Sequence, residues 1–365
     1  MLSPRHSTLD TRHSSDLLGL TSDQLAQAAT LALPSGAGIA ARLYPELMRG
    51  VFDPEAHRVS ATSAAAWRAA FHLTLPTVAR LAEETTPDGL ITSKVVWRLH
   101  DGREIETVRI PMGVGADTSY TLCLSSQVGC KMACSFCETG LMGLVRQLTA
   151  GEIVAQVVAA RALLGWEARN LVFMGMGEAL DNADHLLQAL HIFTDKRGMH
   201  YSQERLTICT AGHAEGLAKL TALGWKRLNL SISLNATTDA LRDSMMPVNR
   251  RTPLASLQAL LAAYPQRRNF TLGVNYCLMP GLNDTREDSQ RIAAFCAPLG
   301  RVLINLIPYN PGSRPLTRAP AEDEVEGFIA WLREDGLPVR RRVTKGRSIM
   351  AACGQLGDPS ARKAR

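Results

Sequence analysis

The sequence has few aromatic residues and lacks a long apolar run. Phe, Trp and Tyr make up 5% of the 365 residues, while hydrophobic residues as a class reach 46%, which is enough for a substantial core. Apolar stretches stay well short of membrane-spanning length. Met1 to Leu20 also lacks the charged region and following apolar region of a secretory signal. We therefore expect a globular cytoplasmic protein with no membrane partner.

The sequence also lacks a large excess of positive or negative charge. The formal net charge of +6 is modest for 365 residues, so by itself it only weakly indicates a polyanionic partner such as nucleic acid. The chain does contain eight cysteines. In a reducing compartment, clustered thiols indicate metal binding or catalysis rather than structural disulfides.

The first third of the chain predicts a leader, a small helical domain and a hairpin. Residues 1–15 are polar and are expected to be disordered, whereas residues 16–90 have an alanine-rich helical pattern up to about Glu84. Thr21 or Ser22 would provide an N-cap for the first helix. Residues 91–118 contain two alternating runs about Asp101-Gly102, which predict a β-hairpin followed by a linker.

Strand-like and helix-like segments then alternate through residues 119–350, before a tail at 351–365. Near-continuous apolar strands separated by helices predict an α/β fold with a parallel sheet, either doubly wound or curved into a partial barrel. In both architectures the chemistry lies at the carboxyl ends of the strands. The expected strands are 120–125, 170–176, 205–210, 227–234, 270–279 and 302–309, with a last strand at 337–343.

Three cysteines, Cys130, Cys134 and Cys137, lie on one loop after the first of these strands. Core cysteines would follow the period of a strand or a helix, so this loop favours a metal site. Zinc and iron–sulfur clusters usually take four protein ligands. Structural zinc would recruit Cys123, which lies within a strand seven residues upstream. An iron–sulfur cluster with one iron open to an exchangeable ligand fits the three thiols better.

The second strand ends in Gly175-Met-Gly177-Glu178. The third glycine of a dinucleotide-binding fingerprint is absent, because residue 180 is Leu, so a Rossmann phosphate site is excluded. Two interpretations stay open. The glycines form a tight turn with Glu178 as a solvated cap, or they let a ligand approach whose cationic amine Glu178 holds.

A further cysteine, Cys353, lies close to the end of the sequence between small residues that would leave its thiol accessible. Basic residues upstream would lower its pKa and attract an anion if they lie nearby; otherwise they form a solvated strand edge. These are Arg340, Arg341, Arg342, Lys345 and Arg347. Cys277 and Cys296 fall within a strand and a helix and are expected in the core.

Taken together, these motifs resemble a known family. The loop 130–137, with its aromatic Phe136, resembles that of the radical S-adenosylmethionine (SAM) superfamily. Four segments narrow the resemblance to the RlmN/Cfr family of RNA adenine methyltransferases over residues 104–356: 123–130, 174–178, 305–311 and 351–356. The resemblance implies a partial (β/α)6 barrel. The N-terminal helical region is similar to the family's RNA-binding domain in position and character.

The resemblance also implies a set of cofactor ligands. A 4Fe-4S cluster would be held by Cys130, Cys134 and Cys137, with SAM chelating the open iron. The positions that bind SAM in the family correspond to Gly177, Glu178, Cys209, Ser233, Leu234, Asn235 and Asn310.

Finally, the resemblance implies the chemistry. Cys353 matches the cysteine that one SAM molecule methylates; a second SAM is cleaved reductively, and its 5′-deoxyadenosyl radical takes hydrogen from that methyl group. The carbon radical then adds to an sp² carbon of adenine, carbon 2 or carbon 8. Cys123 matches the thiol that resolves the adduct as a disulfide with Cys353. Glu106 matches the proposed proton acceptor.

The implied partners are large-subunit ribosomal RNA, with transfer RNA as a further candidate, and a reductant such as flavodoxin or ferredoxin; the implied enzyme is a monomer. A radical SAM enzyme on another substrate and a zinc-stabilised nucleic-acid-binding protein remain the alternatives. The chain departs from the family at several positions without losing a catalytic group. Cys209 replaces serine, Asn235 replaces histidine, Ser348 and Met350 replace acidic residues, and Ala179 in place of proline is closer to the Cfr branch.

Overall fold

The structure, a computed structural model, describes residues 15–33, 36–86, 88–113, 118–265 and 267–358. Most of the expected leader (residues 1–14), part of the linker (114–117) and the end of the tail (359–365) lie outside the described residues. Within the described ranges, helices that are long and apolar enough to cross a membrane are absent. The chain divides into two compact units, each built from segments that are not contiguous in sequence.

The first unit contains the chain up to Pro76 together with Thr149–Trp166 and Gln188–Tyr201. Leu25, Leu43 and Trp67, from three of its helices, are fully buried and form part of its core. The side chain of Thr21 caps the first helix and completes a capping box with Gln24, as one of the two expected caps. The elements of this unit are β1 (Ser15–Asp16), α1 (Ser22–Ala32), α2 (Gly36–Leu47), α3 (Ala61–Ala70), β2 (Phe71–His72) and α5 (Ala150–Leu164).

The second unit is built on a ten-stranded sheet with the order β14-β13-β12-β11-β10-β9-β6-β5-β4-β3. From β6 to β14 every neighbouring pair is parallel, and spatial order follows chain order without a reversal. A doubly wound sheet requires such a reversal, so the partial barrel is the correct alternative. The parallel strands are β6 (Ser119–Cys123), β9 (Asn170–Phe173), β10 (Leu206–Thr210), β11 (Asn229–Ser233), β12 (Leu272–Leu278), β13 (Val302–Pro308) and β14 (Val339–Arg341).

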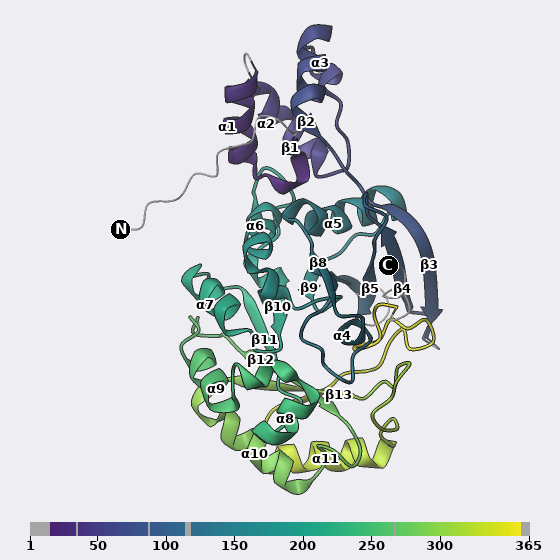
Figure 1. Ribbon diagram of the computed structural model, residues 1–365, viewed down its shortest axis with the longest axis vertical. Coiled ribbons are helices and arrows are strands. Elements are labelled where there is room, and N and C mark those ends of the chain that lie inside the picture. Colours follow the sequence, from purple (N-terminus) through teal and green to yellow (C-terminus); the bar gives the residue numbers. More distant parts are fainter. Residues whose placement is uncertain (1–14, 34–35, 87, 114–117, 266, 359–365) are drawn as a thin grey trace. The chain divides into compact units, whose positions relative to one another are not determined.

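Helices follow the strands of this partial barrel. In Figure 1 the helices α7, α9, α10 and α11 lie along the outer side of the curved sheet, and the yellow C-terminal segment passes beside α4 on the other side. The helices of the barrel are α4 (Glu138–Met142), α7 (Ala214–Ala222), α8 (Asp239–Met245), α9 (Leu254–Ala262), α10 (Arg286–Cys296) and α11 (Glu322–Glu334); α6 (Ala183–Thr194) has residues in both units.

Three antiparallel strands extend the sheet on one side of β6. The expected hairpin is present as β4 (Ile91–Arg98) and β5 (Glu104–Met112), which turn at Asp101-Gly102. The helical prediction was wrong for β3 (Thr77–Thr85), which pairs with β4 as an edge strand. Its Ala, Leu and Glu residues favour a helix, but pairing with β4 outweighs this intrinsic preference.

A short two-stranded ribbon precedes and follows the cysteine loop. It consists of β7 (Gln127–Gly129) and β8 (Leu144–Gln147), which pair antiparallel. Gly129 has a φ of +76°, and a Cβ atom there would collide with the carbonyl oxygen of Gly143. Only glycine therefore lets the two strands approach at this point, immediately before Cys130.

Candidate active site

Backbone hydrogen bonds shape the loop that carries Cys130, Cys134 and Cys137. The amide of Cys137 donates to the carbonyl of Cys134 over 3.2 Å, and the amide of Ser135 donates to the carbonyl of Met245 over 3.0 Å. Ala133, between the first two cysteines, has a φ of +53°, a left-handed conformation that is uncommon for residues other than glycine. The loop is thus held in a bent conformation that turns three thiols toward one cavity.

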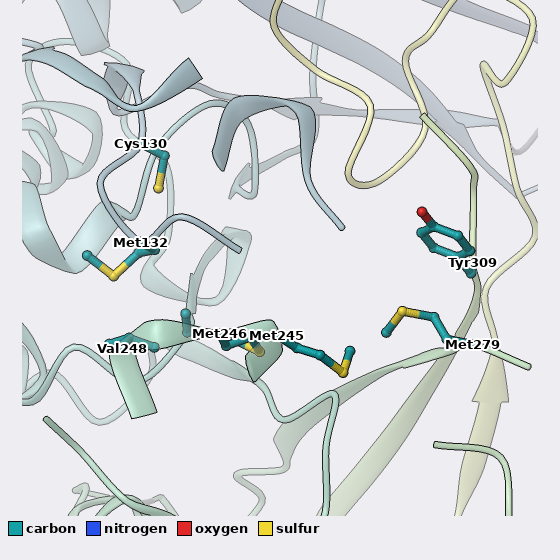
Figure 2. Close-up of a cluster of buried hydrophobic side chains, with 8 residues drawn as sticks. Cys130, Met132, Met245, Met246, Val248, Met279 and Tyr309 are labelled. Atoms are coloured by element: carbon teal, nitrogen blue, oxygen red, sulfur yellow. The ribbon is translucent and has the colours of Figure 1, made fainter. Parts of the chain in front are cut away.

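An apolar cluster rich in sulfur surrounds this loop. Figure 2 shows Cys130 and Met132 on one side and Tyr309 on the other, with Met245 and Met246 between them. Ala211, Val248 and Met279 complete the buried cluster, and Cys134, Phe136, Leu241 and Cys277 pack against it. Burial raises the pKa of all three loop thiols, that of Cys130 to about 12. A metal that binds here must displace the thiol protons.

The arrangement argues against a single zinc ion. Among the residues described, groups of three or more His, Cys, Asp or Glu side chains that could hold one metal ion are absent. Cys123, the fourth ligand that zinc would need, lines a different cavity from Cys130 and Cys134. An iron–sulfur cluster spans several atoms, so its thiolate ligands need not converge on one point, and three thiols facing one cavity fit such a group.

The cavity beside the loop has a volume of about 180 Å³ and lies at the carboxyl ends of the barrel strands. We call it the cluster-side cavity. It brings together nine of the residues expected at the site, from five separate segments of the chain. These are Cys130, Cys134, Cys137, Gly177, Glu178, Cys209, Ser233, Asn235 and Cys353.

Glu178 is a buried carboxylate in the wall of this cavity. Its Oε1 atom accepts from the amide of Leu180 over 3.1 Å, and its Oε2 atom accepts from the amide of Ala211 over 2.8 Å. Burial raises the pKa of Glu178, while these hydrogen bonds act in the opposite direction. Each carboxylate oxygen can accept a second hydrogen bond, so Glu178 can still bind a cationic group. Because Glu178 is buried, the interpretation of this residue as a solvated cap is wrong.

The two glycines before Glu178 are required by the protein itself. A Cβ atom at Gly175 would lie 2.6 Å from the carbonyl oxygen of Leu124. Gly177 has a φ of +100°, and a Cβ atom there would lie 2.6 Å from the Cβ atom of Gln127. Their absence of side chains therefore allows the loop after β9 to pack against the loop after β6.

Polar side chains form a chain across the barrel interior from β13 to β10. The amide nitrogen of Asn305 donates to Oδ1 of Asn275 over 3.0 Å, and the amide nitrogen of Asn275 lies 3.2 Å from the Cys209 sulfur. The hydroxyl of Ser233 lies 3.5 Å from the same sulfur. Burial raises the pKa of Cys209 to about 12, so this thiol is a neutral hydrogen-bonding group at physiological pH.

Leu234 and Asn235 form the turn after β11. Leu234 is fully buried and is not among the residues that line the cavity, although its backbone contributes to the turn. Asn235 has a φ of +57°, and its side chain accepts a hydrogen bond from the amide of Cys277 over 2.9 Å. This side chain therefore ties the turn to β12.

A buried cation, Arg242 on α8, supports the same turns. Its guanidinium donates to the carbonyl oxygens of Leu234, Ser233 and Ala211 and to the side chain of Asn249, with distances of 2.6–3.1 Å. Burial lowers the pKa of Arg242 to about 10, and the nearby Cys134 sulfur and acidic side chains oppose this shift. Arg242 could not be identified as a site residue from the sequence, because the helical pattern around it does not distinguish a buried arginine from an exposed one.

A second cavity, of about 550 Å³, adjoins the first. We call it the barrel-interior cavity. It contains Cys123 and Asn310, and its wall includes Arg340, Arg342 and Lys345. Arg341 also borders this cavity, but its guanidinium is paired with Glu322 and Glu326 of α11. Most of the basic segment thus lines this cavity instead of forming only a solvated strand edge, whereas Arg347 is not among the lining residues.

Cys353 lines both cavities. It has an exposed surface, but protein atoms around the thiol raise its pKa by desolvation, and the positive charge of Arg342 opposes the shift without reversing it. Burial therefore outweighs the effect of the basic neighbours, and the expectation of a lowered pKa for Cys353 was wrong. A charge on Cys353 also contributes to the raised pKa values of Cys123, Cys209 and Cys277. Cys123 lines the barrel-interior cavity, whereas Cys209 and Cys277 line the cluster-side cavity.

Glu106 lies on β5 beneath the C-terminal loop (residues 346–357) and is not among the residues that line either cavity. Its carboxylate lies 3.4 Å from the Lys94 ammonium and accepts from the amide of Gly357 over 3.3 Å. Burial raises the pKa of Glu106 and outweighs the charge of Lys94, which lowers it. A raised pKa brings the carboxylate closer to the range in which it can take up a proton near neutral pH.

Cys277 and Asn275 line the cluster-side cavity, although the sequence predicts Cys277 in the core and does not single out Asn275. Both lie on β12, two positions apart, so their side chains point to the same face of the sheet. Polar or thiol groups at alternate positions of an otherwise apolar strand were the signal that could have identified them.

Comparisons with known proteins agree with this geometry. Residues 124–296 match the Radical SAM superfamily. Over 267 residues the chain is 42% identical to a protein of Protochlamydia amoebophila described as a probable dual-specificity RNA methyltransferase RlmN 1, with 73% of each chain covered. Over 281 residues it is 43% identical to the dual-specificity RNA methyltransferase RlmN of Syntrophotalea carbinolica, with 76% of this chain and 73% of the relative covered.

A solved structure is similar as well. A radical SAM methyltransferase from Sphaerobacter thermophilus matches with a TM-score of 0.81 and 35% sequence identity. The match covers 94% of this chain and 99% of the other. The similarity therefore extends beyond the barrel to nearly the whole chain.

Proposed function

The chain belongs to the RlmN family of radical SAM RNA methyltransferases, and we propose that it methylates an sp² carbon of an RNA adenosine, carbon 2 or carbon 8. The observation that carries this proposal is the position of Cys353 at the junction of two cavities. One cavity contains the three loop thiols, and the other contains Cys123 and basic side chains. A methyl group on Cys353 would be accessible from the cofactor side and from the substrate side.

In this proposal Cys130, Cys134 and Cys137 ligate a [4Fe–4S] cluster, and SAM binds next to it. Bound together, these two cofactors supply a methyl group and a carbon-centred radical. The methionine-rich cluster around the loop excludes water from the thiolates, and the Glu178 carboxylate accepts hydrogen bonds from the cationic amine of SAM. The residues that we propose to contact SAM are Gly177, Glu178, Cys209, Ser233, Leu234, Asn235 and Asn310.

The roles of Cys353, Cys123 and Glu106 follow the order of the reaction. The Cys353 sulfur carries the methyl group, whose carbon radical adds to adenine. The adduct radical would then lose one electron to a one-electron acceptor, for which the oxidised iron–sulfur group is available, and Glu106 accepts the proton that the adenine carbon loses. The Cys123 thiol then attacks the Cys353 sulfur. The S–S bond forms as the S–CH2 bond breaks, and the carbon receives a proton to become the methyl group of the product. The raised pKa of Glu106 supports its role as proton acceptor.

RNA is the substrate class, and we propose that its phosphates contact the basic wall of the barrel-interior cavity. Arg340 and Arg342 are the candidates, whereas Arg341 is paired with α11. We propose large-subunit ribosomal RNA as the substrate, with transfer RNA as a further candidate. Each turnover leaves a disulfide, so the enzyme needs a reducing compartment such as the cytoplasm. We further propose a monomeric enzyme that receives electrons from flavodoxin or ferredoxin.

Mass spectrometry of the Cys353 peptide tests this proposal. We expect the anaerobically reconstituted protein to gain one methyl group on Cys353 after incubation with SAM, whereas the Cys353→Ala variant gains none on this peptide. Iron and sulfide analysis of the same samples verifies the cluster. An intact cluster without methylation of Cys353 would contradict the carrier role, and stoichiometric zinc without sulfide would contradict the cofactor assignment.

A further inference from the structure

The C-terminal loop reaches the cavities because several side chains of the sheet hold it. After Cys353, the loop is held by α4. The amide of Glu138 donates to the carbonyl of Gly354 over 2.8 Å, and the hydroxyl of Thr139 donates to the carbonyl of Leu356 over 2.6 Å. These bonds fix the residues that follow Cys353. The residues that precede it need a separate attachment.

That attachment is provided by Glu84, on the edge strand β3. One carboxylate oxygen accepts from the amide of Gly346 over 2.5 Å. The other accepts from both the amide and the hydroxyl of Ser348, over 2.8 Å and 2.5 Å. A single ionised side chain therefore receives three hydrogen bonds from one turn of the C-terminal loop. Hydrogen bonds to a charged acceptor are about twice as strong as neutral ones.

The turn itself is built to fit against the sheet. Gly346 has a φ of +74°, and a Cβ atom there would lie 2.7 Å from the Cβ atom of Ala351 and 3.1 Å from a methyl carbon of Thr92. Thr92 is the residue on β4 that pairs with Glu84 across the hairpin. The amide of Ala351 closes the turn by donating to the carbonyl of Gly346 over 2.7 Å. The turn thus lies directly over the pair that contains Glu84.

A second attachment lies closer to the thiol. The Lys94 ammonium donates to the carbonyl of Met350 over 3.1 Å, and Lys94 in turn is paired with Glu106. Lys94 and Glu84 lie on neighbouring strands of the same hairpin, two positions apart in register. The hairpin therefore holds the loop at two points before Cys353, and Glu84 is the outer of the two.

We infer that Glu84 is a positioning residue for the Cys353 thiol. Its carboxylate fastens the turn at residues 346–348 to β3, and this attachment keeps the thiol where the two cavities meet, beside Cys123. Glu84 contacts neither cavity, so it acts through the loop and not on the reacting atoms. The role of Cys353 as methyl carrier rests on the proposed function. Its placement by Glu84 rests only on the hydrogen bonds described above.

The first test is the rate at which iodoacetamide alkylates Cys353 in the anaerobically purified protein, followed by mass spectrometry. In Glu84→Gln we expect this rate to rise about tenfold. Loss of one charge-assisted hydrogen bond shifts the equilibrium between the closed and the locally open loop by about this factor, and alkylation follows the open population. Glu83→Gln is the matched control. Its carboxylate is adjacent on β3 but binds the hydroxyl of Ser93 within the hairpin, so this variant is expected to react like the wild type.

A second measurement separates positioning from a general loss of structure. Ser348→Asp places a carboxylate against Glu84 and should accelerate alkylation, whereas the double variant Glu84→Lys, Ser348→Asp restores an attractive pair and should return the rate toward that of the wild type. Diamide-induced formation of the Cys123–Cys353 disulfide should slow in the single variants and recover in the double variant, because it reports the proximity of the two thiols.

Equal alkylation rates in Glu84→Gln and Glu83→Gln would overturn the inference, as would a double variant that reacts like Ser348→Asp alone. These rates are measured without SAM or RNA. A protein that failed to methylate RNA while showing the expected rates would contradict the proposed function and leave the inference standing. Alkylation rates that do not change in the variants of an active RNA methyltransferase would contradict the inference about Glu84 and leave the proposed function standing.

Discussion

Cys123 and Cys353 line the same cavity, although one residue ends β6 and the other belongs to the C-terminal loop. Each thiol is affected by the charge of its surroundings: Cys353 raises the pKa of Cys123 in addition to the larger effect of burial, and Arg342 lowers the pKa of both. This proximity brings together the two thiols that the proposed reaction uses in succession.

Replacing Cys123 with Ala removes the thiol that would attack the Cys353 sulfur. We expect RNA to remain covalently linked to Cys353, so that the protein–RNA adduct accumulates while methylated product falls by at least about tenfold, the scale on which removal of a reacting side chain acts. Denaturing gel electrophoresis before and after nuclease digestion detects the adduct. Cys296→Ser, a buried cysteine of α10, should not accumulate it. Free methylated RNA from Cys123→Ala at the wild-type rate would contradict the resolving role.

Arg242 brings a buried positive charge close to the loop thiols, with the Cys134 sulfur as a neighbour. Reduction adds negative charge to the cluster, and a nearby cation favours the reduced state. We expect Arg242→Met to lower the reduction potential by about 60 mV or more, a tenfold change in a one-electron equilibrium, whereas Arg242→Lys retains most of the effect. Redox titration followed by electron paramagnetic resonance measures it. Equal potentials in the folded wild type and Arg242→Met would show that this charge does not act on the cluster.

Gly175→Ala tests the packing of the loop after β9. The added Cβ atom would meet the backbone of Leu124 at 2.6 Å, and the amide of Leu124 is itself fixed by a hydrogen bond to the carbonyl of Val172. We expect the free energy of unfolding to fall by about 1–3 kcal/mol, the usual cost of overpacking. Gly327→Ala, on α11 with open space around it, should be neutral or stabilising by up to about 1 kcal/mol. Urea denaturation compares the two variants, and equal stabilities would contradict the close approach.

The pH dependence of stability tests the attachment of the C-terminal loop. Partial burial alone would raise the pKa of Glu84, but the hydrogen bonds from Ser348 and Gly346 lower it below its usual value. A carboxylate with a lowered pKa in the folded state stabilises the protein above its unfolded pKa of about 4.3 and loses this contribution as the pH falls through the folded value. The difference in unfolding free energy between wild type and Glu84→Gln should therefore be constant near neutral pH and shrink below about pH 4. A difference that grows on acidification would contradict this sign.

The barrel and most of its functional ends could be predicted from the sequence because their signals are local. Apolar strands such as β12 and β13 alternate with helices, and the cysteine loop stands out by its spacing. The hairpin around Asp101-Gly102 has a recognisable turn. In each case the residues that specify the structure lie within one short segment.

The features that could not be predicted depend on contacts between distant segments. β3 forms only because β4 offers it a pairing partner, and Arg242 is buried because three carbonyl oxygens from two loops converge on it. The pKa of Cys353 depends on the balance between burial and Arg342, which only the folded chain determines. The attachment of residues 346–348 to Glu84 joins positions more than two hundred residues apart.

Nucleoside analysis of RNA is the most direct test of the central claim that Cys353 delivers a methyl group to adenosine. Unmodified ribosomal RNA and transfer RNA are incubated with SAM, a reductant and either the reconstituted protein or its Cys353→Ala variant, then digested and analysed by mass spectrometry. We predict 2-methyladenosine or 8-methyladenosine with the wild type and neither with Cys353→Ala. Equal amounts of methyladenosine from both proteins, or none from a wild type with an intact cluster and a methylated Cys353, would contradict it.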